Sequence, residues 1–295
     1  MNEKRGIFKN PILPYLLVAP QLIITVLFFF WPAGQAIIQA FLISDPFGSG
    51  SEFVWFENFT AVLGSIEYVE SLIRTFIFSF LTAVLSMSCG LILAVLVNRL
   101  KKSKQMLQTL LIWPYAIAPA MAGVLWVFLL HPTFGAIGYF LINTLGLDWN
   151  PVLQPSHALI MIIFASAWKQ VSYNFVFFLS GLQGIPGSLM EAAAIDGAGP
   201  MKRFWKIVFP LLSPTGFFLL VMNLVYAFFD TFGVIHTTTE GGPGGATNTL
   251  VYKVYADGFV GLDLGVSAAQ SVLLMAMTII LTIIQFKYIE KKVHY

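Results

Sequence analysis

Charged residues are scarce in this chain of 295 residues, and their scarcity excludes most soluble folds. Only 10% of the residues are Asp, Glu, Lys or Arg, whereas 58% are hydrophobic. Soluble domains carry roughly a quarter charged residues, so a soluble fold has too little polar surface to cover this much apolar side chain. The composition therefore predicts a membrane protein.

Three further absences narrow the function. The single cysteine, Cys89, excludes an intrachain disulfide. No Gly-Lys-Ser/Thr phosphate loop is present, so we expect this chain not to hydrolyse ATP and not to be an enzyme. No Cys/His cluster indicates a metal site, and 16 basic against 14 acidic residues give no basic surface for nucleic acid. We expect no cofactor bound by this chain.

Long stretches without charge predict an all-α protein that crosses the membrane. A spanning helix needs about 20 apolar residues, and six stretches qualify if the fourth is allowed one charge, Lys169. The spans predicted around these stretches, within a transmembrane domain of residues 13–288, are 13–33, 74–97, 107–130, 158–181, 214–235 and 265–287, so a charge can lie near a span end.

The basic residues predict the orientation, because positively charged loops stay in the cytoplasm. All but Arg74, Lys169 and Lys253 fall on one side of the predicted spans. This places the N-terminus (1–12), the C-terminal tail (289–295) and the loop 184–212, between spans four and five, in the cytoplasm.

The cytoplasmic loop has the signals of two short helices. Ser188 and Glu191 have the spacing of a capping box, in which both side chains satisfy backbone N–H groups at a helix start. Gly197 favours a left-handed helix stop, and Pro200 favours the first turn of a second helix that reaches Pro210. Such helices form either a docking element or a simple link between two spans.

Two charges, Lys169 and Asp230, lie inside predicted spans, where charge is costly and marks functional sites. A lysine near the bilayer midplane attracts an anion such as phosphate, and Asp230 accepts hydrogen bonds from substrate hydroxyls. The alternative is that polar groups join helices by hydrogen bonds, with Lys169 and Asp230 as a salt bridge. Polar residues at helical spacing form three stripes that we expect to line a cavity: Lys169, Ser172 and Tyr173; Asn223, Tyr226 and Asp230; Ser267, Gln270 and Ser271.

The loop also carries a family signature. Its spacing is that of the EAA loop, with Phe209 in place of Leu. The pattern runs Glu191-Ala192-Ala193, three residues, Gly197, nine residues, Ile207, one residue and Phe209-Pro210. On this motif the chain resembles the inner-membrane permeases of ABC importers. The resemblance implies a type I importer permease fold in a bacterial inner membrane, with 184–212 as the coupling loop that contacts an ATPase. By matching position, the coupling residues are Glu191, Ala192, Ala193, Asp196 and Gly197.

Further segments resemble the A-type permeases of sn-glycerol-3-phosphate importers over nearly the whole chain. They are Leu13–Thr25, Trp168–Phe175, Asn223–Phe232 and Gly261–Leu264. In the related maltose importer, the stretch that matches Phe229–Phe232 contributes sugar-binding residues, which implies that role for Asp230 and Thr231. Tyr173, Gln270 and Ser271 are weaker transfers of the same kind.

The resemblance also implies partners and a cargo. The partners are a second, homologous permease, two ATPase subunits that use ATP and Mg, and a periplasmic binding protein. The expected cargo is sn-glycerol-3-phosphate or a related glycerophosphodiester. Two alternatives stay open at this point: an ABC importer for a neutral sugar, which should not need Lys169, and an ion-coupled secondary transporter, which would need an ion site and often a repeated half.

Overall fold

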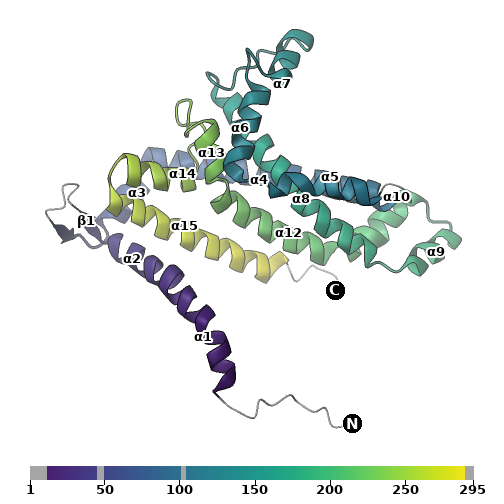
Figure 1. The fold of residues 1–295 in the computed structure, drawn as a ribbon, viewed down its shortest axis with the longest axis horizontal. Coiled ribbons are helices and arrows are strands. Elements are labelled where there is room, and N and C mark those ends of the chain that lie inside the picture. Colours follow the sequence, from purple (N-terminus) through teal and green to yellow (C-terminus); the bar gives the residue numbers. More distant parts are fainter. Residues whose placement is uncertain (1–11, 45–49, 101–103, 290–295) are drawn as a thin grey trace. The chain divides into compact units, whose positions relative to one another are not determined.

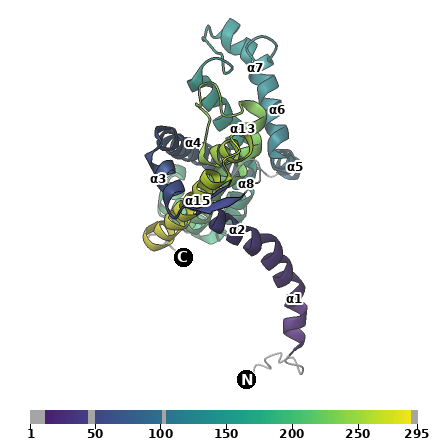
Figure 2. The same ribbon diagram turned by 90° about the vertical axis from the view of Figure 1, so that its left-hand side faces the viewer.

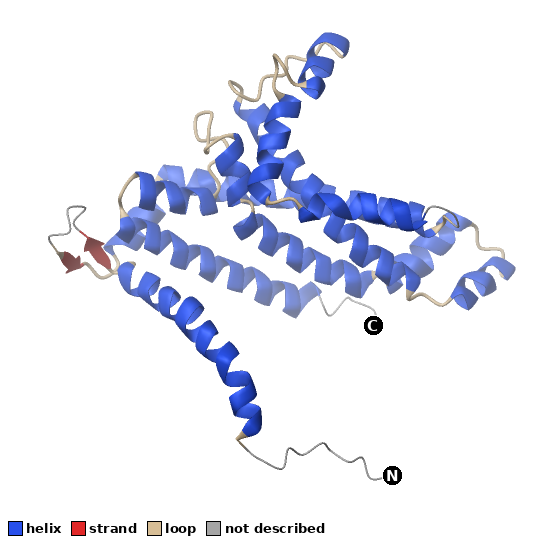
Figure 3. Ribbon diagram, viewed as in Figure 1, coloured by secondary structure: helices blue, strands red, loops and turns tan. Residues whose placement is uncertain are grey.

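The computed structural model describes residues 12–44, 50–100 and 104–289 of the chain. The expected cytoplasmic tails therefore lie almost wholly outside the described residues. The described part is helical apart from one short antiparallel strand pair, which confirms the predicted fold class (Figure 3).

The chain divides into two units, and each is described by itself. One unit comprises residues 1–64 and 257–273, and the other comprises residues 65–256 and 274–295. The elements of the smaller unit, with π-helical segments labelled η, are α1 (Leu13–Thr25), η1 (Val26–Phe30), α2 (Trp31–Gln39), β1 (Leu42–Ser44), β2 (Ser51–Phe53) and α3 (Glu57–Gly64).

Two elements, η5 (Ala256–Val260) and α15 (Leu264–Ile284), belong partly to each unit. The other elements of the larger unit are α4 (Ile66–Asn98), α5 (Lys104–Ala116), α6 (Pro119–Leu130), α7 (Ala136–Tyr139), η2 (Phe140–Thr144), α8 (Pro155–Gln183), α9 (Gly187–Ile195), α10 (Pro200–Arg203), η3 (Phe204–Val208), α11 (Phe209–Leu211), α12 (Ser213–Val225), η4 (Tyr226–Asp230), α13 (Phe232–Thr238), α14 (Leu250–Tyr255) and η6 (Gln285–Ile289).

In the smaller unit, a buried asparagine holds the strand pair against α3. Asn58 is 3% exposed, and its Nδ2 donates to the carbonyl oxygens of Ala40 and Leu42, both at 3.0 Å. Gly265 of α15 packs against the same carbonyl of Leu42 and the Asn58 amide, so closely that a Cβ at this position has no room. These contacts attach the start of α15 to the strand pair.

The core of the larger unit is the contact of α4 with α8, which both views in Figures 1 and 2 place together. Small polar side chains recur along the buried face of α4, at Ser71, Thr75, Ser79, Thr82 and Ser86. Small residues let helix backbones approach closely in a membrane, where the hydrophobic effect does not drive helices together. At Gly90 the approach is closest, because an added Cβ would lie 2.7 Å from Asn174 Cβ.

The structure gives five helices that are long and apolar enough to cross a membrane, or six when one bent pair counts as a single span. The bent pair is α5 with α6, which meet at 101° where the sequence predicts one continuous helix over 107–130. The second candidate, Ile66–Asn98, begins earlier than the predicted residue 74. The membrane boundaries themselves stay predictions.

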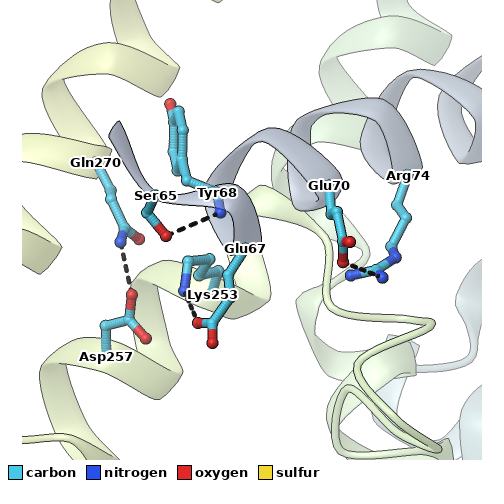
Figure 4. Close-up of polar contacts among 8 residues, drawn as sticks. All are labelled: Ser65, Glu67, Tyr68, Glu70, Arg74, Lys253, Asp257 and Gln270. Carbon is cyan, nitrogen blue, oxygen red and sulfur yellow. Dashed lines mark hydrogen bonds and ion pairs between the residues drawn. The ribbon is translucent and has the colours of Figure 1, made fainter. Parts of the chain in front are cut away.

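The segment from α13 to α14 is a compact loop with a buried lysine beside it. Gly242-Pro243 is a cis peptide, and Thr247 bridges the loop, with its hydroxyl donating to the Gly242 carbonyl at 2.9 Å. Figure 4 shows Lys253, whose side chain is 6% exposed, paired with Glu67 of α4 at 3.6 Å. Burial raises the pKa of the Tyr252 phenol, with smaller contributions from Glu240 and Tyr255, so this group is neutral at physiological pH.

Candidate functional site

The first helix of the loop 184–212 starts two residues earlier than its capping signals predict. α9 begins at Gly187 with Pro186 as its N-cap, and no side chain caps it. Ser188 therefore lies inside the first turn, and the predicted capping box of Ser188 and Glu191 is wrong. Pro186 is the cause: its backbone (φ −59°, ψ 128°) is extended, and the chain turns helical directly after it.

The end of α9 follows its sequence signal. Gly197 has φ +76°, a left-handed conformation that glycine adopts without steric cost. The Ala198 N–H donates to the Ala193 carbonyl at 2.9 Å, and the Gly197 N–H donates to the Ala194 carbonyl at 3.1 Å. This pair of bonds is a Schellman motif, which satisfies carbonyl groups left open at a helix end.

The second helix of the loop is tied back to the first. Pro200 occupies the start of α10 as predicted, and Arg203 at its end donates from a guanidinium nitrogen to the Met190 carbonyl at 3.2 Å. The outer side of the loop is open, since Glu191, Ala192, Asp196 and Gly197 are exposed and Ile195 is 87% exposed. Ala193 is half-buried. The loop is thus a closed hydrogen-bonded unit with an exposed apolar side chain.

Lys169 of α8 is buried, but it does not pair with Asp230. Its side chain is 7% exposed, and its Nζ donates to the carbonyl oxygen of Tyr115 at 3.0 Å. The ammonium also lies over the Tyr115 ring, 4.8 Å from the centroid, which is a cation–π contact. Lys169 and Asp230, both described by the structure, form no ion pair with each other, so the suggested salt bridge is wrong.

The Tyr115 carbonyl is available because the helix breaks immediately after it. In a continuous helix this oxygen would accept the N–H of the residue four positions on. That residue is Pro119, which has no N–H. The open carbonyls at the end of α5 carry the negative end of the helix dipole, which favours a cation there. Lys169 supplies that cation from the neighbouring helix.

A run of aromatic rings extends from this lysine along α8. The centroids of Tyr115 and Tyr173 are 5.5 Å apart, those of Tyr173 and Phe177 are 4.7 Å apart, and Phe177 meets Phe218 of α12 at 5.1 Å. Ser172, predicted to share the face of Lys169, is 1% exposed. Tyr173 is half-buried, so the structure brings Lys169 and Tyr173 together around Tyr115.

The second predicted stripe separates into packing residues and one exposed charge. Asn223 is 1% exposed and exchanges two side-chain hydrogen bonds with Asn174, at 2.7 and 3.1 Å. Tyr226 is buried with its hydroxyl 3.3 Å from the Ser166 carbonyl. These contacts favour the alternative that the neutral groups join helices. Asp230 is exposed at the end of η4.

The residues that were assigned a role by matching position also form hydrogen bonds within the chain. Thr231 is fully buried and its hydroxyl donates to the Ala227 carbonyl at 3.1 Å. On α15, Gln270 Nε2 donates to Asp257 at 2.6 Å, as Figure 4 shows, and the Ser271 hydroxyl donates to the Ser267 carbonyl. Among the described residues no group of three or more His, Cys, Asp or Glu side chains is placed to hold a metal ion.

Two residues of this site were missed in the sequence. Tyr115 acts through its backbone carbonyl, and the signal for it was the pair Pro114 and Pro119 inside a predicted span. Asn174, one residue beyond the predicted stripe of α8, forms the amide pair with Asn223, to which the Ser86 hydroxyl adds a third bond at 2.9 Å. No local sequence pattern indicates which asparagine pairs with which across two helices.

Comparison with known proteins gives a family match over most of the chain and relatives that match over its full length. The family described as the inner membrane component of binding-protein-dependent transport systems matches residues 86–295. The sn-glycerol-3-phosphate transport system permease protein UgpA of Rhizobium meliloti (strain 1021) is 59% identical over 292 residues, covering 99% of both chains. The protein of the same name from Escherichia coli O157:H7 is 53% identical over the whole of both chains.

Solved structures agree with this assignment at the level of the fold. A chain in the crystal structure of a bacterial alginate ABC transporter, in complex with an alginate pentasaccharide-bound periplasmic protein, superposes with a TM-score of 0.79. It covers 92% of both chains at 21% identity. A chain of the inward-facing MetNI methionine ABC transporter gives a TM-score of 0.53 at 18% identity, covering 81% of this chain and 99% of that one. The chain belongs to the family of inner membrane components of binding-protein-dependent transport systems.

Proposed function

We propose that this chain is a permease subunit of an ATP-driven importer that moves sn-glycerol-3-phosphate or related glycerophosphodiesters by alternating access. The observation that carries the proposal is the 59% identity, over 99% of both chains, to a permease named for sn-glycerol-3-phosphate transport. The match covers the loop 184–212 and the polar spans.

The expected partners follow from the same assignment. They are a second, homologous permease, two ATPase subunits below the membrane and a periplasmic binding protein above it. The geometry of the loop supports contact with the ATPase, because α9 is short, closed at its end by a Schellman motif and exposed along Glu191, Ala192 and Ile195. A closed helical unit transmits displacement better than a flexible linker. ATP and Mg belong to the partner, and this chain holds no cofactor.

The cargo path is proposed around the two span charges. Lys169 offers a buried ammonium for the phosphate, and the exposed Asp230 accepts hydrogen bonds from hydroxyl groups. Tyr173 adjoins the lysine through Tyr115. The other predicted substrate-pathway residues are engaged in contacts within the chain, so they contact the cargo only after a change of conformation breaks those contacts. These residues are Ser172, Asn223, Tyr226, Thr231, Gln270 and Ser271.

Uptake by the reconstituted complex tests this function. Proteoliposomes with both permeases, the ATPases and the binding protein should accumulate sn-glycerol-3-phosphate only when ATP is supplied on the side of the membrane where the ATPases lie. A panel with glycerophosphodiesters and neutral sugars then separates the alternatives. Uptake of a neutral sugar without the phosphate ester would contradict the cargo, and uptake driven by a proton gradient without ATP would contradict the importer class.

A further inference from the structure

We propose that Lys169 is a switch. Its hydrogen bond to the Tyr115 carbonyl stabilises the break between α5 and α6, and a phosphomonoester group of the cargo breaks this bond by binding the ammonium. The inference rests on the proposed function, since it assumes an anionic cargo, and it assigns to that cargo both a binding group and a structural consequence of binding.

The lysine and the break between α5 and α6 depend on each other. The break leaves the Tyr115 carbonyl without its helical N–H donor, because that donor position is Pro119. Lys169 Nζ lies 3.0 Å from this oxygen and comes from α8, a different helix. The contact therefore fixes the end of α5 to α8 at the point where the chain bends by 101°.

Lys169 is buried with neutral partners. Its acceptor is a carbonyl, its other contact is the face of an aromatic ring, and it forms no ion pair with a described carboxylate. Lys253 is the matched contrast: it is buried to a similar degree, yet Glu67 pairs with it at 3.6 Å. Burying a cation without an opposite charge costs free energy, so an anion binds more favourably at Lys169 than at a lysine that is already paired.

The two charges inside the spans also bear on the shape of the ligand. Asp230 carries the other charge inside the predicted spans, and it is exposed and forms no ion pair with Lys169. A molecule with an anion at one end and hydroxyl groups at the other matches this pair of charges. When its phosphate oxygens accept the ammonium, the Tyr115 carbonyl loses its donor, and the end of α5 must move to find another.

The experiment measures the break directly. The native thiol is removed by Cys89→Ser, and spin labels are placed at two exposed positions, Leu110 on α5 and Phe128 on α6. The labelled permease is assembled with its partner permease and ATPases in lipid nanodiscs. Distances between the labels are recorded with increasing sn-glycerol-3-phosphate, and with glycerol as the neutral counterpart.

In the otherwise unchanged complex, the distance distribution should shift with sn-glycerol-3-phosphate and not with glycerol. Lys169→Met should alter the distribution before cargo is added and raise the half-maximal cargo concentration about tenfold or more, as expected when a charged hydrogen bond is lost. Lys169→Arg should retain the shift. Lys253→Met, the matched control, should destabilise the complex while keeping the cargo response.

The outcomes separate the two proposals. If the complex shows no ATP-driven uptake of sn-glycerol-3-phosphate, the proposed function fails. If uptake occurs but Lys169→Met responds at the original cargo concentration, or if glycerol shifts the labels equally, the switch alone is overturned.

Discussion

The coupling loop and the surroundings of Lys169 belong to the same unit of the chain, but they are built in opposite ways. The loop is exposed, closed by local hydrogen bonds and readable from adjacent residues, from Gly187 to Arg203. The lysine is buried, and its partner lies 54 positions away, on a helix that ends where a proline removes a donor. The difference teaches that the loop, which we propose contacts the ATPase, is encoded locally, whereas the lysine site, which we propose binds the cargo, depends on tertiary contacts.

The largest expected effect is on the loop. Gly197→Pro is incompatible with φ +76°, since proline holds φ near −65°, and it removes the N–H that closes the Schellman motif. We expect at least a tenfold loss of ATP-driven uptake, by an order-of-magnitude argument in which misplacement of the helix costs more than about 1.4 kcal/mol. ATP hydrolysis should continue without uptake. Gly199→Ala is the control, because Gly199 has φ −66° and nothing near its Cβ position.

A smaller effect is expected at the amide pair between α8 and α12. Asn174→Leu leaves the Asn223 amide buried without its partner, which costs about 1–3 kcal/mol. The double variant Asn174→Leu with Asn223→Leu removes both amides, so its cost should be less than the sum of the two single costs. Thermal unfolding of the assembled complex measures this. Strict additivity would show that the two side chains do not act as a pair.

The smallest effect is expected at Ser188. Because the helix starts at Gly187 without a side-chain cap, Ser188→Ala should change stability by less than about 0.5 kcal/mol, against about 1 kcal/mol for loss of a true N-cap. The same unfolding assay decides it. A loss near the larger value would restore the capping box and contradict the helix start found here.

How much the sequence predicts depends on the range of the interactions. The helical membrane fold, the left-handed Gly197 and the start of α10 at Pro200 follow from composition and from single residues with fixed backbone preferences. The start of α9 was misplaced by two residues because Ser188 and Glu191 satisfy the spacing of a cap while Pro186 decides the geometry. Spacing alone does not say which of two neighbouring signals wins.

The polar residues of the spans were harder to assign. Helical periodicity correctly placed Asn223 and Tyr226 on one face, but the face is closed by Asn174 and Ser166 on α8. A salt bridge between Lys169 and Asp230 was the alternative to substrate contact, but the lysine donates to a backbone carbonyl that only a broken helix exposes. Such an acceptor is invisible to a search among side chains, so Tyr115 was missed.

The most direct test of this account asks whether the two regions have separable tasks. Spin labels at positions 110 and 128 are read in the assembled complex for Glu191→Lys and for Lys169→Met, each with ATP alone and with sn-glycerol-3-phosphate alone. Glu191→Lys should keep the response to cargo and lose the response to ATP, and Lys169→Met should keep the response to ATP and lose the response to cargo. Loss of both responses in both variants would contradict this separation of tasks.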